Sequence, residues 1–140
     1  MTTSFINVEV LRLPGSNSDC IVYDMSGQGR YRESWSFFYP DVDGIFFVID
    51  CADKERLSVA NEVLLELARH PGLARRDIPL VILGNKQDAE GAISELDLRK
   101  FMQIDRMKQL NKSLEITVKG TQGIRGVGII ECLNTFEGAI

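Results

Sequence analysis

The chain has 140 residues, enough for one domain with a hydrophobic core, and a net charge of −4 at pH 7. Its charges are interspersed, which excludes a basic footprint for nucleic acid, and no apolar run is long enough to span a bilayer. Cys20, Cys51 and Cys132 lie far apart without a CxxC or Cys/His cluster, which argues against a disulfide framework or zinc site and favours a reducing, cytoplasmic compartment.

The first part of the chain predicts a β-hairpin. Residues 5–13 alternate apolar and polar side chains, residues 14–19 are dense in turn formers, and residues 20–23 predict the second strand. A glycine-containing break follows. The aromatic-rich residues 30–39 then predict an irregular helix that Pro40 ends.

Two continuous apolar runs, residues 44–50 and 78–84, predict buried strands of a parallel sheet, and the first is the clearest in the chain. Between them lies a set of residues at helical spacing: Leu57, Ala60, Leu64, Leu67 and Ala68. This spacing predicts a helix that Asp53 can cap and that the His-Pro-Gly of residues 70–72 can end.

The last third of the chain predicts one more strand between two helices. Ser94 and Asp97 resemble a capping box that opens a helix. Residues 114–118 predict a strand, residues 119–123 a polar, glycine-rich loop, and residues 128–136 a closing helix.

Strands that alternate with helices predict one α/β domain over residues 1–140, with a mainly parallel sheet flanked by helices and the hairpin as its antiparallel edge. In such sheets, ligands bind just beyond the carboxyl ends of the strands. Asp24, Asp88 and Gly120 each follow a predicted strand. We therefore expect these three residues to meet at one rim of the sheet.

The tetrad Asn85-Lys86-Gln87-Asp88 has the chemistry to bind a guanine base. The carboxylate of Asp88 can accept two hydrogen bonds from adjacent N–H groups, such as N1 and N2 of guanine. The amide of Asn85 can hold the loop and the base edge, and the aliphatic stem of Lys86 can lie across a planar ring. Taken alone, the same residues could form a polar turn.

The stretch Asp24-Met25-Ser26-Gly27-Gln28 fits the terminal phosphate of a nucleotide. Asp24 can hold Mg²⁺ through water, because magnesium keeps several of its waters. Gly27 lets a backbone N–H approach a phosphate oxygen, and Gln28 can orient a water for in-line attack. Alone, this stretch could be a strand-to-helix turn. Paired with the tetrad, it indicates a nucleotide site.

Together the motifs resemble those of the small GTPases of the ADP-ribosylation factor-like group, over nearly the whole chain. The resemblance implies a P-loop-type small GTPase fold and a GTP/GDP- and Mg²⁺-dependent switch that regulates membrane or ciliary protein trafficking. It implies these site residues: for guanine Asn85, Lys86, Asp88, Gly120 and Thr121, for the γ-phosphate Gly27, for hydrolysis Gln28, and for Mg²⁺ Thr2 and Asp24. It also implies that effector and coat proteins, among them a ciliary cargo-coat complex, bind an aromatic surface made of Phe5, Tyr23 and Phe38.

The GxxxxGK[ST] loop with which these GTPases hold the α- and β-phosphates does not occur in the 140 residues. We therefore expect an N-terminally incomplete GTPase domain that is inactive as given and would reach a membrane only through a further N-terminal segment. Its expected location is the cytoplasm, with the peripheral membrane and the cilium or basal body as alternatives. Two alternatives are a nucleotide-free protein-interaction domain and a receiver-like domain with Asp24 or Asp50 as phosphoacceptor. The receiver-like interpretation leaves the tetrad unexplained.

Overall fold

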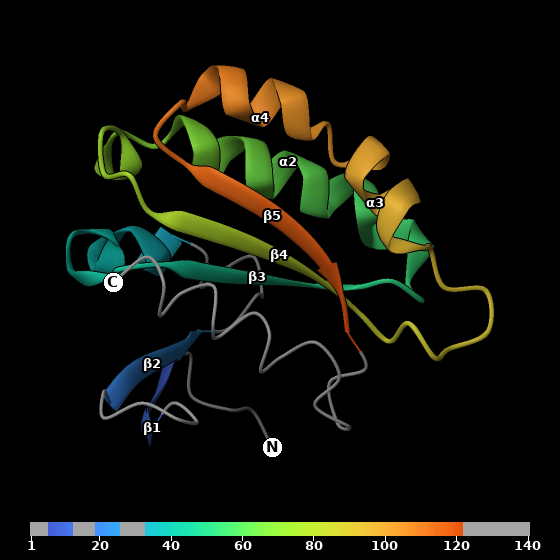
Figure 1. The fold of residues 1–140 in the computed structure, drawn as a ribbon, viewed down its shortest axis with the longest axis horizontal. Helices are drawn as coiled ribbons and strands as arrows, with labels where there is room; N and C mark the ends of the chain where they lie inside the picture. Colours follow the sequence, from blue (N-terminus) through green and yellow to red (C-terminus); the bar gives the residue numbers. More distant parts are fainter. Residues whose placement is uncertain (1–5, 13–18, 26–32, 122–140) are drawn as a thin grey trace. The chain divides into compact units, whose positions relative to one another are not determined.

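The computed structural model describes residues 6–12, 19–25 and 33–121 (Figure 1). The chain divides into two units, Met1–Val42 and Asp43–Ile140. Backbone hydrogen bonds form one sheet in each unit. The first sheet is β1-β2 and the second has the order β3-β4-β5. The described strands thus separate the hairpin from the parallel sheet in their hydrogen bonding.

The first unit contains the predicted hairpin. Strands β1 (Ile6–Arg12) and β2 (Asp19–Met25) pair antiparallel, with Val10 opposite Ile21. Both of these apolar side chains are exposed. The two strands predicted from the alternating apolar and polar residues and the turn formers are therefore confirmed.

A 3₁₀ helix, η1 (Glu33–Asp41), follows in the same unit. The prediction that Pro40 ends the helix is wrong, because Pro40 lies inside η1. The fixed φ of proline falls in the helical range, so the last turn of a short helix can accommodate it. The rings of Tyr23 and Phe38 contact each other, with centroids 5.1 Å apart, which joins η1 to β2.

The second unit is built on three parallel strands, β3 (Ile45–Asp50), β4 (Pro79–Asn85) and β5 (Glu115–Gly120). The central strand β4 is buried along nearly its whole length, which confirms the prediction from its apolar run. Strand β3, predicted to be the clearest buried strand, is only half-buried, and Val48 is 61% exposed. A strand at the end of the strand order shares its faces with fewer neighbours than a central strand does.

Strand β5 runs further than its apolar pattern indicates. Lys119 and Gly120, predicted to open a loop, continue the strand by pairing with Leu83 and Gly84. Backbone pairing does not depend on side-chain polarity, so the ladder continues past the last apolar residue. The loop after β5 therefore begins at Thr121.

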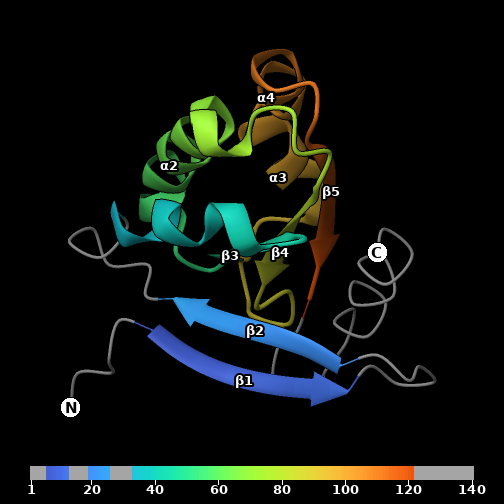
Figure 2. The ribbon, with the colours of Figure 1, turned by 90° about the vertical axis from the view of Figure 1, so that its left-hand side faces the viewer.

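Three α-helices cover one face of the parallel sheet (Figures 1 and 2): α2 (Leu57–Arg69), α3 (Glu95–Phe101) and α4 (Ile104–Leu110). The sequence predicted α2 and α3 but missed α4, whose seven residues bury only Ile104 and Met107. Among the described residues, no helix is long and apolar enough to cross a membrane. The predicted closing helix at residues 128–136 lies outside the described residues.

The helix boundaries test three predicted caps. The Ser94 hydroxyl accepts a hydrogen bond from the backbone of Asp97, which confirms the helix start. His70 ends α2, and its Nδ1 accepts from the backbone of Gly72. The prediction for Asp53 is wrong: it precedes a 3₁₀ turn, η2 (Lys54–Arg56), without a side-chain capping bond, and its carboxylate pairs with Arg56 instead.

Gly84 lies near the end of β4, where a larger residue has no room. A Cβ added there would lie 2.7 Å from Leu98 Cδ2 and 2.9 Å from Cys51 Sγ, and both side chains are fully buried. We expect Gly84→Ala to lower the free energy of unfolding by about 1–3 kcal/mol, because it overpacks this junction. Urea denaturation measures the loss.

Cys51→Ala is the matched second variant, because it removes one of the two close contacts. The double variant should lose less stability than the sum of the two single losses. A Gly84→Ala protein as stable as the wild type would contradict this account of the junction.

Candidate functional site

The carboxyl ends of the three parallel strands lie level with one another. In the ladder, Asp50 pairs with Asn85, and Gly84 pairs with Gly120. The strand register thus brings the tetrad of residues 85–88 beside the end of β5, as the sequence predicted for a ligand site.

Hydrogen bonds hold the start of the tetrad against the β5 end. Thr121 is 2% exposed, and its hydroxyl lies 3.1 Å from the amide oxygen of Asn85. The backbone N–H of Thr121 donates to the carbonyl of Gly84 at 2.9 Å. With its oxygen engaged by a hydroxyl, the Asn85 amide presents its NH₂ as the group that can donate to a base.

Lys86 forms an ion pair that the sequence analysis did not predict. Its ammonium lies 2.8 Å from Asp50 Oδ2, and both side chains remain partly exposed. Its backbone is left-handed, with φ 63°, an uncommon conformation for a side chain with a Cβ. The sequence analysis considered Asp50 only as a phosphoacceptor. In the structure, Asp50 holds the ammonium end of the Lys86 side chain, whose aliphatic stem we expect to lie on the base.

This contact shifts the protonation equilibria of both groups. The hydrogen bond from Lys86 holds the pKa of the Asp50 carboxyl below its ordinary value, against a smaller opposing effect of burial. The same bond raises the pKa of the Lys86 ammonium. Both groups therefore stay charged near neutral pH.

Gly120 can meet a base only through its backbone, because it has no side chain. Its N–H donates to Oε2 of Glu95, the first residue of α3, at 2.9 Å. No pattern in the sequence predicts this contact, because it joins residues 25 positions apart. A base carbonyl that bound this N–H would have to replace the Glu95 carboxylate.

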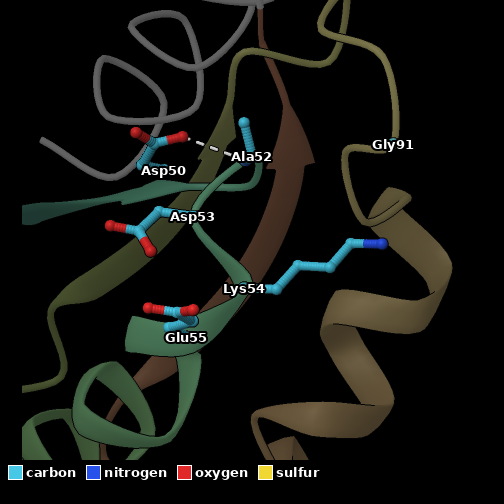
Figure 3. Close-up of a pocket in the computed structure, with 6 residues that line it drawn as sticks. All are labelled: Asp50, Ala52, Asp53, Lys54, Glu55 and Gly91. Atoms are coloured by element: carbon cyan, nitrogen blue, oxygen red, sulfur yellow. Dashed lines mark hydrogen bonds between the residues drawn. The ribbon is translucent and has the colours of Figure 1, made fainter.

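An open hollow of about 590 Å³ lies beside the end of β3. Figure 3 shows six lining residues, Asp50, Ala52, Asp53, Lys54, Glu55 and Gly91, with the three carboxylates along one side. One Asp50 oxygen accepts from the backbone of Ala52 at 2.9 Å. Two of the three acids, Asp50 and Asp53, pair with Lys86 and Arg56, so the hollow has no surplus of positive charge to attract phosphate.

The other predicted site residues cannot be placed beside this rim. Thr2, Gly27 and Gln28 lie outside the described residues, as does Phe5. Asp24 lies in β2 of the first unit. Its convergence with Asp88 and Gly120 stays a prediction. Asp88 itself is exposed at the end of the tetrad, where a ligand can reach its carboxylate.

The sequence profile of the ADP-ribosylation factor family matches residues 1–140. The chain belongs to the ADP-ribosylation factor family. It is 33% identical over 135 residues to ADP-ribosylation factor-like protein 6 of Danio rerio, which covers 96% of this chain and 70% of that protein. The protein of the same name in Caenorhabditis elegans is 28% identical over 118 residues, covering 84% of this chain and 60% of that protein.

A solved structure, of the Arl6 BBS3 small GTPase from Trypanosoma brucei with bound nucleotide analogue GppNp, has the same fold. The TM-score is 0.83 at 25% identity, and the match covers 99% of this chain and 81% of that chain. The predicted α/β small GTPase fold and the resemblance to this group are confirmed. The family match decides against the receiver-like alternative. The chain spans about three fifths of the nematode relative, so the activity of a whole family member remains a proposal for it.

We expect Lys86→Met to raise the pKa of Asp50 toward its ordinary value, because the variant removes the hydrogen bond that lowers it. Carboxyl-carbon NMR over an acid titration measures this shift. Because the folded pKa lies below the unfolded one, the contribution of Asp50 to stability is present above the unfolded pKa and is lost as the pH falls through the folded pKa.

Lys54→Met is the matched control, since Lys54 lines the same hollow but does not lower the pKa of Asp50. It should leave the Asp50 titration nearly unchanged. If Lys86→Met also left it unchanged, the ion pair would not exist in solution.

Proposed function

We propose that this Arf-family chain carries the guanine-recognition part of a GTP-dependent molecular switch. The observation that carries the proposal is the tetrad of residues 85–88, which follows the buried strand β4 and is hydrogen-bonded to the end of β5. The GppNp bound to the related Trypanosoma brucei GTPase supports a guanine nucleotide as the ligand.

In this proposal, three parts of the tetrad recognise the base. The exposed Asp88 carboxylate accepts from two N–H groups of guanine, and the NH₂ of Asn85 donates to the base edge. The stem of Lys86, held at its ammonium by Asp50, lies on the ring. Gly120 and Thr121 complete the site at the end of β5.

We assign the phosphate chemistry to residues of the first unit by resemblance. Gly27 contacts the γ-phosphate, Gln28 orients the attacking water, and Thr2 and Asp24 bind Mg²⁺. Magnesium would supply charge neutralisation at the phosphates. Of these four residues the structure describes only the backbone of Asp24, in β2.

We further propose that effector or coat proteins bind the aromatic surface of the first unit. The rings of the half-buried Tyr23 and Phe38 pack against each other with an interplanar angle of 42°, and the adjacent Phe37 is 79% exposed. Exposed aromatic side chains beside a packed pair suit a protein interface. By resemblance to the ADP-ribosylation factor-like group, we also propose a cytoplasmic role in membrane or ciliary trafficking, with a cargo coat as partner.

Asp88→Asn should change base preference from guanine toward xanthine, because an amide donates to the C2 carbonyl of xanthine but cannot accept from the guanine N1–H in the same way. We expect guanine affinity to fall about 100-fold, since hydrogen bonds to a charged group contribute roughly 1.5–3 kcal/mol. Competition between GDP and XDP, in a nucleotide-binding form of the protein, measures the preference.

Glu90→Gln is the matched control, because Glu90 is an exposed acid in the same loop. It should leave base preference unchanged. An Asp88→Asn protein that kept its preference for guanine would remove Asp88 from the proposed role.

The 140-residue chain should bind GTP and guanosine with similar, weak affinity. The described rim has groups for the base, but its hollow has no surplus of positive charge, and Lys86 is paired with Asp50. The phosphates therefore add little favourable energy. Calorimetric titration with both ligands tests this, and sub-micromolar GTP binding would show that another segment holds the phosphates.

A further inference from the structure

Gln87 is the one residue of the tetrad for which sequence analysis gave no role, yet it links three segments around the site. Its side-chain Nε2 donates to the carbonyl of Gly84 at 3.2 Å and to that of Ile93 at 3.0 Å. Its backbone N–H donates to the carbonyl of Thr121 at 3.1 Å. These bonds join the end of β4, the loop before α3 and the loop after β5.

The side chain of Gln87 also fills the space beside Gly120. A Cβ added to Gly120 would lie 3.0 Å from Cγ and 3.2 Å from Cδ of Gln87. This is closer than ordinary van der Waals contact, so one of the two groups would have to move. The absence of a side chain at residue 120 and the glutamine at residue 87 therefore form a matched pair.

We propose that Gln87 is a positioning residue that sets the orientation of Asp88 for base recognition, with Gly120 as its required partner. The effect of Gln87 on nucleotide binding rests on the proposed function, whereas its packing against Gly120 does not. Because Asp88 directly follows Gln87 in the chain, a loop held at residue 87 fixes where the next carboxylate projects.

The chemistry of the side chain explains why glutamine suits this place. Its NH₂ group supplies two donors, and the structure presents two backbone carbonyl oxygens to it. Glutamate at residue 87 would place a carboxylate against these two oxygens, and methionine would fill the space with no donor. Gln87→Glu should therefore disturb the site more than Gln87→Met.

The first test is a double-variant cycle on thermal stability, which needs no nucleotide. Gly120→Ala should lower the Tm by about 4 °C through the close contact with Gln87. In a Gln87→Ala background, which removes Cγ and Cδ, most of that loss should disappear. Additive losses would overturn the matched pair.

Gly120→Ala combined with Glu90→Ala is the control cycle, because the exposed Glu90 lies in the same loop away from this contact. Its two effects should add. Coupling as large as that with Gln87 would mean that the loop responds as a whole, which would also overturn the pairing.

The second test separates positioning from a purely structural role. Inosine nucleotides lack the 2-amino group of guanine, so the ratio of GDP to IDP affinity reports how well a carboxylate meets that group. In a nucleotide-binding form, Gln87→Met should reduce this ratio about 10-fold, because a displaced Asp88 carboxylate loses its hydrogen bond with the 2-amino group of guanine. Gln87→Glu should reduce the ratio more.

The outcomes distinguish this inference from the proposed function. A wild-type protein with no preference for GDP over IDP would overturn the proposed function and the positioning role together. A wild-type preference that persists in Gln87→Met, with a lowered Tm, would leave the proposed function standing and overturn the positioning role.

Discussion

The parallel pairing of β4 with a strand on each side is the constraint on which the candidate site depends. Because β4 is buried along nearly its whole length, its backbone groups must find partners in β3 and β5. The two ladders pair Leu80–Asn85 with β3 and Pro79–Gly84 with β5, residue by residue. Gly84 and Gly120 are therefore held level, and the tetrad emerges beside the end of β5.

At that rim, where the backbone ladder ends, side chains form the hydrogen bonds to the backbone. Where the strands end, the carbonyls of Gly84 and Ile93 accept from Gln87, and the N–H of Gly120 donates to Glu95. The bonds to Ile93 and Glu95 join segments that the sheet alone would leave separate. The loop that carries Asp88 is thus held from several sides, and a rigid loop recognises a ligand at a lower entropic cost.

The charges at the rim suit the base of the proposed nucleotide but not its phosphates. Lys86 is paired with Asp50, and the hollow beside β3 contains three acids against one lysine. Such a surface suits a neutral base with donor groups better than a triphosphate. In the proposed function, base recognition is therefore assigned to the second unit, and the phosphate roles of Gly27 and Gln28 are assigned to the first.

The sequence by itself determined the order and type of most elements and the tetrad, because apolar runs, helical spacing and donor–acceptor chemistry are local properties. It did not determine helix α4, which buries two side chains, or the two extra residues of β5, which pair by backbone alone. Only the tertiary structure decided that Asp50 holds Lys86, that Glu95 holds Gly120 and that Gln87 fills the space beside Gly120. These contacts join residues that are distant in sequence, and a sequence pattern does not show which distant residues lie side by side in the folded sheet.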